Sequence, residues 1–132
     1  MKYVFKKLHL LLVLIVACAA FPGEVFSQKS NQMVRIANIQ VDPSQLTAYN
    51  EALKVQMETA VKLEPGVLTY YAVADKKNPA SITILEIYAD TAAYKSHIQT
   101  PHFKHYKTTV EHMVKSLQLV DVDMVGFARK PD

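Results

Sequence analysis

Hydrophobic residues follow two different periods along the chain after residue 32. Branched residues stand at short intervals from Met33 to Val41, a pattern typical of a β-strand. Beyond this segment the apolar residues recur every three or four positions, which predicts a helix that ends before the Pro-Gly pair at positions 65–66. Asp42 and Pro43 suit the cap and first turn of this helix, and Gln45 is placed to complete a capping box.

The remainder of the chain predicts a hairpin, two helices and a final strand. The segments 67–74 and 81–89 have strand composition and are joined by a polar connection. Asp90 can cap a short helix through Ile98, and Thr100 followed by Pro101 begins another helix. An apolar stripe on that last helix consists of Phe103, Tyr106, Val110, Met113 and Leu117. The segment 119–127 predicts the last strand.

The resulting order is β-α-β-β-α-β, so the sequence predicts an α+β fold of the ferredoxin-like type. In the third strand Ile82 and Ile84 point to one face, whereas Leu85 and Ile87 point to the other. Both faces of the sheet therefore need cover, but the helices can cover one face only. We expect a homodimer in which the open faces of two sheets pack together as a dimeric α+β barrel.

The start of the chain predicts export. A block of apolar residues from Leu8 to Ala20 follows a basic start, as in a secretory signal peptide, and is too short for a membrane span of about 20 residues. We expect a signal peptide at residues 1–27, cleaved after Ser27, and a domain at residues 28–132 that is periplasmic or secreted. The alternative is a lipoprotein anchored through Cys18, because Ile15–Cys18 forms a loose lipobox.

Cleavage changes the composition of the mature chain. It removes three lysines and one glutamate from 15 basic and 12 acidic residues, which leaves 12 and 11 and no basic run that would indicate nucleic-acid binding. No cysteine remains after residue 27, which excludes disulfides and thiolate catalysis. Gly66 and Gly126 are the glycines of the mature chain, so no glycine-rich loop is available for a nucleotide or flavin.

Three segments resemble the antibiotic biosynthesis monooxygenase family. Residues 64–71 (Glu-Pro-Gly-Val-Leu-Thr-Tyr-Tyr) are similar to the family's EPG-x-L-x-Y segment, residues 85–90 to the end of its third strand, and residues 100–103 (Thr-Pro-His-Phe) to its SPHF helix start. The resemblance extends from about Met33 to Phe127. It implies a dimeric α+β barrel and, in several branches, oxygen chemistry without a metal or cofactor; other branches isomerise small sugars or degrade haem. Haem degradation is disfavoured, because Asn38 matches that branch but His97 and Lys107 replace its Trp and its haem-ligating His.

The candidate catalytic residues are His102, Asn38 and Glu86. His102 stands in the first turn of its helix, where the helix dipole disfavours imidazolium, so it could accept a proton; the alternative is a packing role at the helix start. Asn38 could hold a substrate oxygen or make an internal hydrogen bond. Burial among apolar neighbours would raise the pKa of Glu86 and suit it to acid-base work; a structural partner such as Arg35 or a lysine is at least as strong an alternative.

Aromatic and imidazole side chains supply the candidate substrate-binding residues: Tyr70, Tyr71, Tyr88, His97 and His105. Such walls suit a flat aromatic with a few oxygens, though tyrosines also serve as core. No metal site is expected, because His102, His105 and His112 would be spread too far along one helix to bind one ion.

These observations predict an exported, cofactor-free monooxygenase that oxidises a quinol-like or polyphenolic aromatic with dioxygen. Replacing His102 should then reduce turnover by about a hundredfold or more. A binding protein for a small hydrophobic ligand and an isomerase of a small oxygenated metabolite are the alternatives. The expected partners are the small substrate and a second copy of the chain, with a membrane involved only if Cys18 carries lipid.

Overall fold

The computed structural model describes residues 31–131. Its elements are β1 (Met33–Val41), the 3-10 turn η1 (Pro43–Gln45), α1 (Leu46–Leu63), β2 (Val67–Ala74), β3 (Ser81–Tyr88), α2 (Thr91–His97), α3 (Pro101–Val110) and β4 (Val114–Val122). The expected signal peptide, its cleavage site and Cys18 lie outside the described residues. None of the helices within 31–131 has the length and apolar character needed to cross a bilayer.

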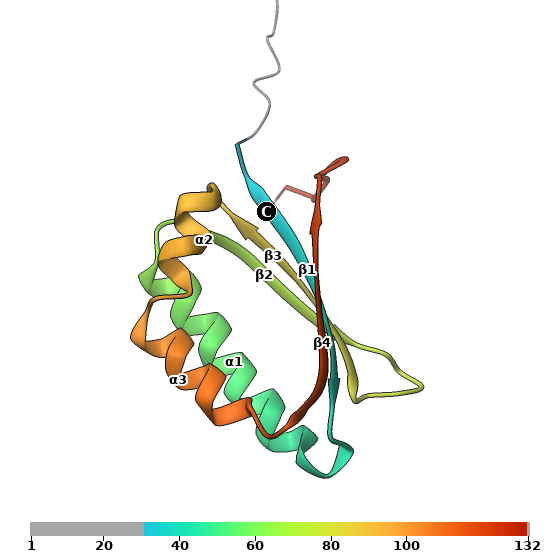
Figure 1. The fold of residues 1–132 in the computed structure, drawn as a ribbon. Helices are drawn as coiled ribbons and strands as arrows, with labels where there is room; N and C mark the ends of the chain where they lie inside the picture. The colour runs from blue at the N-terminus through green and yellow to red at the C-terminus, as the bar shows by residue number, and fades with distance from the viewer. Residues whose placement is uncertain (1–30, 132) are drawn as a thin grey trace, which may run out of the picture.

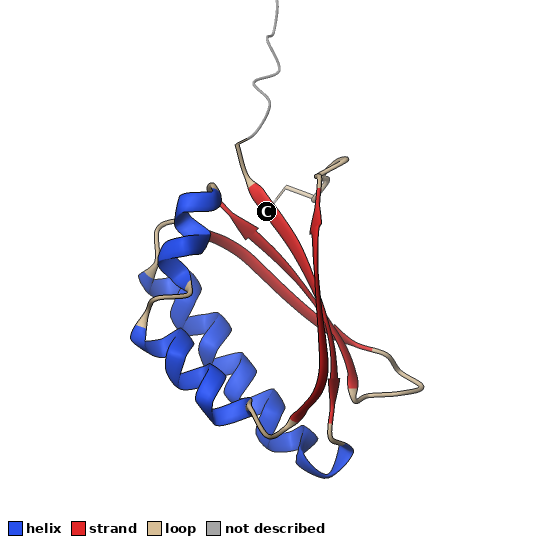
Figure 2. Ribbon diagram, viewed as in Figure 1, coloured by secondary structure: helices blue, strands red, loops and turns tan. Residues whose placement is uncertain are grey.

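The four strands form one antiparallel sheet in the order β2-β3-β1-β4, with β1 and β3 in the centre. All the helices lie on one face of this sheet, and no helix covers the other face within the described chain (Figures 1 and 2). This arrangement confirms the predicted ferredoxin-like α+β fold. Side chains on the helix-covered face lie inside the molecule, so any enclosed site must be built from that face.

The N-terminal caps follow the sequence signals in two helices and depart from them in a third. The side chains of Asp90 and Thr100 accept hydrogen bonds from the third residue after each, at the starts of α2 and α3. Asp42 caps η1 through the backbone N–H and hydroxyl of Ser44. The predicted capping box is wrong: because η1 comes before α1, Gln45 becomes the N-cap residue of α1 and donates instead to the backbone oxygen of His112 at 3.5 Å.

The last helix is shorter than predicted. α3 ends at Val110, and the segment 111–113 forms a turn in which Met113 N–H donates to the Val110 oxygen. β4 starts at Val114 rather than near residue 119 and ends at Val122. The apolar stripe misled the prediction, because Leu117 continues the helical spacing of Val110 and Met113 but pairs with Ile39 of β1 as a strand residue. Backbone pairing along the whole of β1 outweighs this local periodicity.

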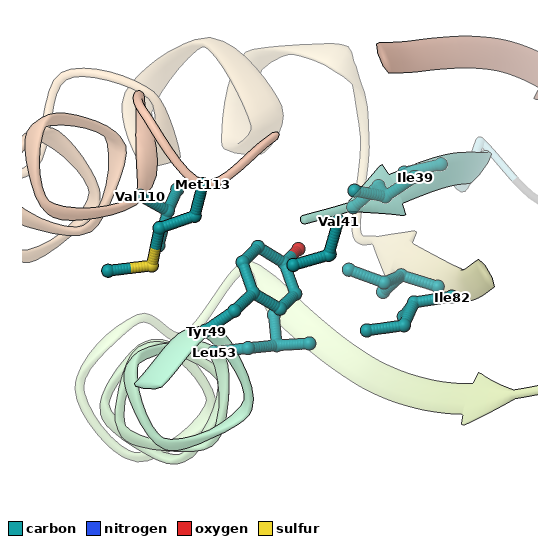
Figure 3. Packing of buried hydrophobic residues seen from close by; sticks show 9 residues of the cluster. Ile39, Val41, Tyr49, Leu53, Ile82, Val110 and Met113 are labelled. Carbon is teal, nitrogen blue, oxygen red and sulfur yellow. The ribbon is translucent and has the colours of Figure 1, made fainter. Parts of the chain in front are cut away.

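The main core lies between α1, the end of α3 and the centre of the sheet (Figure 3). Val41, Tyr49 and Ile82 are each 3 % exposed or less and contact one another across the layers. Burying aliphatic side chains of this size contributes about 1.5–3 kcal/mol each. This packing fixes one end of the helical layer firmly against the sheet.

A close backbone approach fixes the other end. Pro65 and Gly66 end α1, as predicted, and the Gly66 oxygen accepts from Ala89 N–H at 2.9 Å. A Cβ on Gly66 would lie 2.5 Å from the Cβ of Ala93 on α2, which is closer than any real contact. The missing side chain at position 66 therefore permits α2 to pack where it does.

Candidate functional site

A cavity of about 500 Å³ lies between the helical layer and the covered face of the sheet. Its walls are mostly aromatic and aliphatic, and its polar groups come from every layer: Arg35 on β1, Gln56 on α1, Tyr70 on β2, Glu86 and Tyr88 on β3, and Lys107 on α3. A cavity of this size and composition matches the usual site for a small organic ligand.

Glu86 is the carboxyl group on the sheet wall of this cavity. It is mostly buried, and its Oε2 accepts a hydrogen bond from the Tyr88 hydroxyl at 2.9 Å. Burial raises the pKa of Glu86, and the Tyr88 hydrogen bond and the charges of Arg35 and Lys107 offset only part of that increase. A carboxyl group with a raised pKa beside an apolar cavity is suited to accept and return a proton.

Arg35 does not form an ion pair with Glu86, which was one of the structural alternatives for that carboxyl group, although the two residues are register partners on adjacent strands. Its guanidinium donates to Asp121 Oδ1 at 2.7 Å and lies 4.3 Å from the centre of the Tyr94 ring. Glu86 is thereby left with a tyrosine hydroxyl as its hydrogen-bond partner and its charge only partly balanced.

Tyr70 and Tyr88 stand side by side behind Glu86. Their hydroxyl oxygens are 2.7 Å apart, and their rings pack edge to face with centroids 6.2 Å apart. Burial raises the pKa of both phenols far above the usual value. Both hydroxyls therefore remain protonated at any physiological pH, and they serve as hydrogen-bond donors and acceptors rather than as anions.

A second cluster continues from Tyr70 away from the cavity. The Tyr70 hydroxyl is 2.8 Å from His97 Nε2, and His97 Nδ1 is 2.9 Å from Glu64 Oε1. The same Glu64 oxygen is 2.5 Å from His102 Nε2. The His97 side chain is 1 % exposed, and burial lowers its pKa, with Glu64 acting in the opposite direction.

Glu64, His97 and His102 also form a possible metal-ligand group. Their donor atoms lie within 4.8 Å of one another, and two histidines with one carboxylate are a known donor set for non-haem iron. The sequence did not predict this group, because its three members come from the end of α1, the end of α2 and the start of α3. In this structure the Glu64 oxygen is at hydrogen-bond distance from both imidazoles, which is the geometry of a hydrogen-bonded triad.

Gln56 presents a polar group without a partner to the same cavity. Its side chain is 5 % exposed, and within residues 31–131 neither its Nε2 nor its Oε1 has a hydrogen-bond partner in the protein. A buried, unpaired amide costs about 1–3 kcal/mol. A ligand that offers one donor and one acceptor would remove this cost, so Gln56 marks a polar contact point for an occupant.

The structure places the sequence candidates in three different locations. Glu86, Tyr70 and Tyr88 line the cavity. His97 and His102 are brought together behind it with Glu64, and neither is on the cavity wall.

The remaining three candidates are away from the cavity. His105 is exposed on α3, and Tyr71 is 56 % exposed on the open face of the sheet. Asn38 also lies on that face, where it accepts from Thr83 at 3.1 Å and donates to Gln118 at 3.5 Å. Asn38 thus makes the internal hydrogen bonds that were the alternative to a substrate contact.

Two residues of the site had no predicted role. Glu64 belongs to a segment that resembles the family, but its partners are 33 and 38 positions away in the sequence. Gln56 occupies an inward position of α1 between Leu53 and Ala60, both of which are buried. A polar residue in the middle of an apolar helix face was the signal that could have revealed Gln56.

The fold and this cavity define a small α+β domain with an aromatic ligand pocket enclosed between one sheet face and its helices. The family model described as antibiotic biosynthesis monooxygenase matches residues 33–109. The chain therefore belongs to the antibiotic biosynthesis monooxygenase family, as the three sequence segments indicated.

Solved structures agree with this assignment. A protein of Bacteroides thetaiotaomicron named as an antibiotic biosynthesis monooxygenase is 52 % identical, with a TM-score of 0.73, and the match covers 77 % of this chain and 97 % of that one. A monooxygenase-named protein of Lactobacillus acidophilus is 30 % identical over 68 % of this chain and 43 % of that one, with a TM-score of 0.67. A Caulobacter crescentus protein shares the fold at 21 % identity, a TM-score of 0.69 and coverage of 74 % and 93 %. Among curated proteins there is no match.

Proposed function

We propose that this protein is a monooxygenase that oxidises a quinol-like or polyphenolic aromatic with dioxygen and needs no metal or cofactor. The observation that carries the proposal is a mostly buried carboxyl group, Glu86, on the wall of an aromatic cavity of about 500 Å³. Family membership supports monooxygenase chemistry. The substrate class is our inference from the groups that line the cavity.

Glu86 takes the role of general base that the sequence suggested for His102. A phenol bound in the cavity gives its O–H proton to Glu86, and the resulting anion is electron-rich enough to pass one electron to dioxygen. Recombination joins dioxygen to a ring carbon that bears a hydrogen, ortho or para to the phenolate, and Glu86 returns its proton to give a hydroperoxide. The O–O bond then breaks: one oxygen atom stays on the carbon as a carbonyl, and the other leaves as water with the hydrogen of that carbon and the returned proton. One phenol and one dioxygen thus give one quinone and one water.

The remaining polar groups of the cavity support binding of such a substrate. The Gln56 amide offers a donor and an acceptor to a second substrate oxygen. Arg35 and Lys107 line the cavity and place positive charge where the phenolate develops. Preorganised charge in a site that excludes water stabilises such an anion more than water does.

The test is oxygen consumption by the purified protein against a panel of hydroquinones and anthrone-like phenols, with each rate corrected for autoxidation. We expect uptake with at least one phenol, loss of that uptake in Glu86→Gln, and no change on dialysis against a chelator. Loss on chelation with recovery on adding iron would instead assign the reaction to Glu64, His97 and His102 and overturn the metal-free proposal. Substrate proton exchange without oxygen uptake would indicate an isomerase, and tight binding without chemistry would indicate a binding protein.

We also propose that the open face of the sheet is the interface of a homodimer. Tyr71, Val73 and Val120 on this face are 56, 63 and 37 % exposed, which is unusual for large apolar side chains on a central sheet. A second copy would cover them by sheet-to-sheet packing. Light scattering that gave a monomer mass at micromolar concentration would contradict this proposal.

Export remains a proposal that rests on the sequence of residues 1–27. Expression with the native N-terminus, followed by fractionation and mass spectrometry, would separate the two processing routes. A mature chain that begins at Gln28 supports signal-peptide cleavage. A diacylglycerol mass on Cys18 would support the lipoprotein alternative and place the protein at a membrane surface.

A further inference from the structure

Two tyrosines of the helical layer share one hydrogen bond at the cavity. Tyr49 extends from α1 into the space between the helices and the sheet (Figure 3), and Tyr106 is its partner on α3. Their hydroxyl oxygens are 3.0 Å apart, and their rings are tilted by 59° with centroids 6.5 Å apart. Both residues line the cavity. The pair therefore presents hydroxyl groups to an occupant from the helical side.

Counting hydrogens shows that this pair has one donor to spare. Each phenol carries one O–H hydrogen, and the bond between the two hydroxyls uses only one of them. Within residues 31–131 neither hydroxyl has another hydrogen-bond partner. Burial raises the pKa of both phenols, so both hydrogens stay in place at physiological pH. Whichever phenol donates to the other, one O–H is left for an occupant of the cavity.

Tyr106 is the better placed of the two to use the spare hydrogen. Tyr49 is 0 % exposed, whereas Tyr106 is only partly buried. An unpaired O–H costs less free energy where water or a ligand can reach it. We therefore expect Tyr49 to donate to Tyr106, and Tyr106 to donate into the cavity. The bond that Tyr106 accepts polarises its own O–H and strengthens the bond that it donates.

Glu86 faces the cavity from the sheet, on the side opposite the tyrosine pair. Its Oε2 accepts from Tyr88, whereas its Oε1 has no hydrogen bond within residues 31–131. The charge of Glu86 is close enough to the pair to contribute to the raised pKa of both Tyr49 and Tyr106. A ligand oxygen between the sheet and the helices can therefore meet Glu86 Oε1 on one side and the pair on the other.

We propose that Glu86 and Tyr106, the latter supported by Tyr49, form a two-sided binding site for a phenolate oxygen. This role rests on the proposed function, in which a substrate phenol gives its proton to Glu86. In that step the phenol O–H bond breaks and an O–H bond forms on Glu86, which becomes a donor to the oxygen it has deprotonated. Tyr106 supplies the second donor from the helical side.

Two such donors favour the anion over the neutral phenol. Hydrogen bonds to a charged oxygen are about twice as strong as those between neutral groups, and a cavity that excludes water strengthens them further. A neutral carboxyl group and a tyrosine hydroxyl together form the oxyanion site of a known isomerase. Arg35 and Lys107 also bring positive charge to the cavity, so a preference for anions must be traced to the pair by substitution.

The test is equilibrium dialysis, without dioxygen, of the purified protein with para-nitrophenol and with its methyl ether, para-nitroanisole. The two probes share one ring, but only the phenol can become an anion, and its absorption spectrum shows whether the bound form is ionised. We expect the wild type to bind para-nitrophenol as the anion, at least about tenfold more tightly than para-nitroanisole. Tyr106→Phe should raise the dissociation constant of para-nitrophenol by about tenfold or more and leave that of para-nitroanisole unchanged.

Two further variants complete the comparison. Tyr49→Phe leaves Tyr106 its hydroxyl but removes the bond that polarises it, so the dissociation constant of para-nitrophenol should rise by less than in Tyr106→Phe. Tyr71→Phe is the matched control, because it removes a tyrosine hydroxyl from the open face of the sheet, and it should change neither constant. Circular dichroism checks the fold of each variant.

The wild type alone can contradict the proposal, because equal binding of the two probes would overturn it. Binding of para-nitrophenol that Tyr106→Phe leaves unchanged would overturn it too. If Tyr106→Phe does not fold, Tyr49→Phe decides in its place, and an unchanged dissociation constant in that variant rejects the site.

An oxygen-uptake measurement separates this proposal from the proposed function. With an active phenol, Tyr106→Phe should lower kcat/KM by about tenfold or more, since the lost bond is strongest to the developing anion. Anion binding that is lost in Tyr106→Phe, with no oxygen uptake by the wild type for any phenol, would retain the site and reject the monooxygenase. Equal oxygen uptake by the wild type and Tyr106→Phe, with unchanged probe binding, would retain the monooxygenase and reject the site.

Discussion

Tyr70 and Tyr71 are neighbours in β2, yet they lie in different chemical environments. Tyr70 faces the helices, lines the cavity and forms hydrogen bonds with Tyr88 and His97. Tyr71 faces the open side and is 56 % exposed. The same amino acid thus serves a buried polar series on one face and a proposed dimer surface on the other, because successive strand residues point to opposite faces.

The polar groups of the two faces differ in the same way. On the covered face Glu86 is the start of a hydrogen-bonded series that crosses β3, β2, α2 and the end of α1. On the open face the Asn38 side chain bonds its cross-strand neighbours Thr83 and Gln118. The comparison teaches that the helical layer extends the polar contacts beyond the sheet, because Tyr70 bonds His97 of α2, whereas Asn38 bonds residues of β3 and β4.

The largest expected effect belongs to the covered face. Glu86→Gln keeps the size of the side chain but removes the base, so kcat/KM should decrease by between about a hundredfold and ten-thousandfold. Steady-state oxygen uptake measures it, with Glu51→Gln on the exposed side of α1 as the control that retains wild-type rates.

The pH dependence of activity tests whether Glu86 acts in its ionised form. Glu86 acts when ionised, and burial raises its pKa. Activity should therefore increase with pH through a range above that of an ordinary glutamate, and this increase should be absent from the residual activity of Glu86→Gln. An increase that survives in the variant would assign the base to another group.

A difference in the free energy of unfolding should separate a buried histidine of the helical layer from an exposed one. His97→Ala opens a cavity and removes one hydrogen-bond partner each from Glu64 and Tyr70, so the free energy of unfolding should decrease by about 3 kcal/mol. His105→Ala on the exposed side of α3 should change it by less than about 0.5 kcal/mol. Urea unfolding followed by circular dichroism compares them. Equal effects would mean that the buried cluster adds nothing to stability.

Gln56→Met should have two effects of opposite sign. Removal of an unpaired buried amide should stabilise the free protein by about 1 kcal/mol, whereas loss of the substrate contact should raise KM by about tenfold. Thermal unfolding and oxygen-uptake kinetics measure the two effects. A destabilised variant with unchanged KM would show that Gln56 is a packing residue.

The smallest expected effect belongs to the open face. Val73→Asp would place one charge from each subunit in the proposed interface, and the dimer dissociation constant should increase by about tenfold or more. Val55→Asp on α1 is the matched control, since Val55 is 65 % exposed and on the helical side of the molecule. Light scattering over a dilution series gives the dimer dissociation constants of both variants. Equal constants would show that the interface lies elsewhere on the molecule.

Local signals were enough to predict most of the fold. The helix starts at Asp90 and Thr100 depend on residues within three positions, and the sheet order follows from the order of the elements. The end of α3 was not predictable, because Leu117 fits a helical stripe and a strand equally well. Its pairing with Ile39, far away in the sequence, settles the matter.

The site was predicted in part for the same reason. Residue type indicated Glu86, Tyr70 and Tyr88, and all three line the cavity. The role of Glu64 depends on three helix ends meeting, a contact that no local pattern specifies. For Asn38 the period of the strand gave two faces but not which of them the helices would cover.

The missing side chain of Gly66 has a consequence for how this sequence can vary among its relatives. The space that a Cβ there would occupy is filled by the Cβ of Ala93, and α2 also carries His97. Any methyl group gained at position 66 must be offset by a loss at position 93 if α2 is to keep its place. We expect the sizes of these two residues to be inversely related across homologous chains, and sequences that are large at both positions to have lost the histidine of α2 as well.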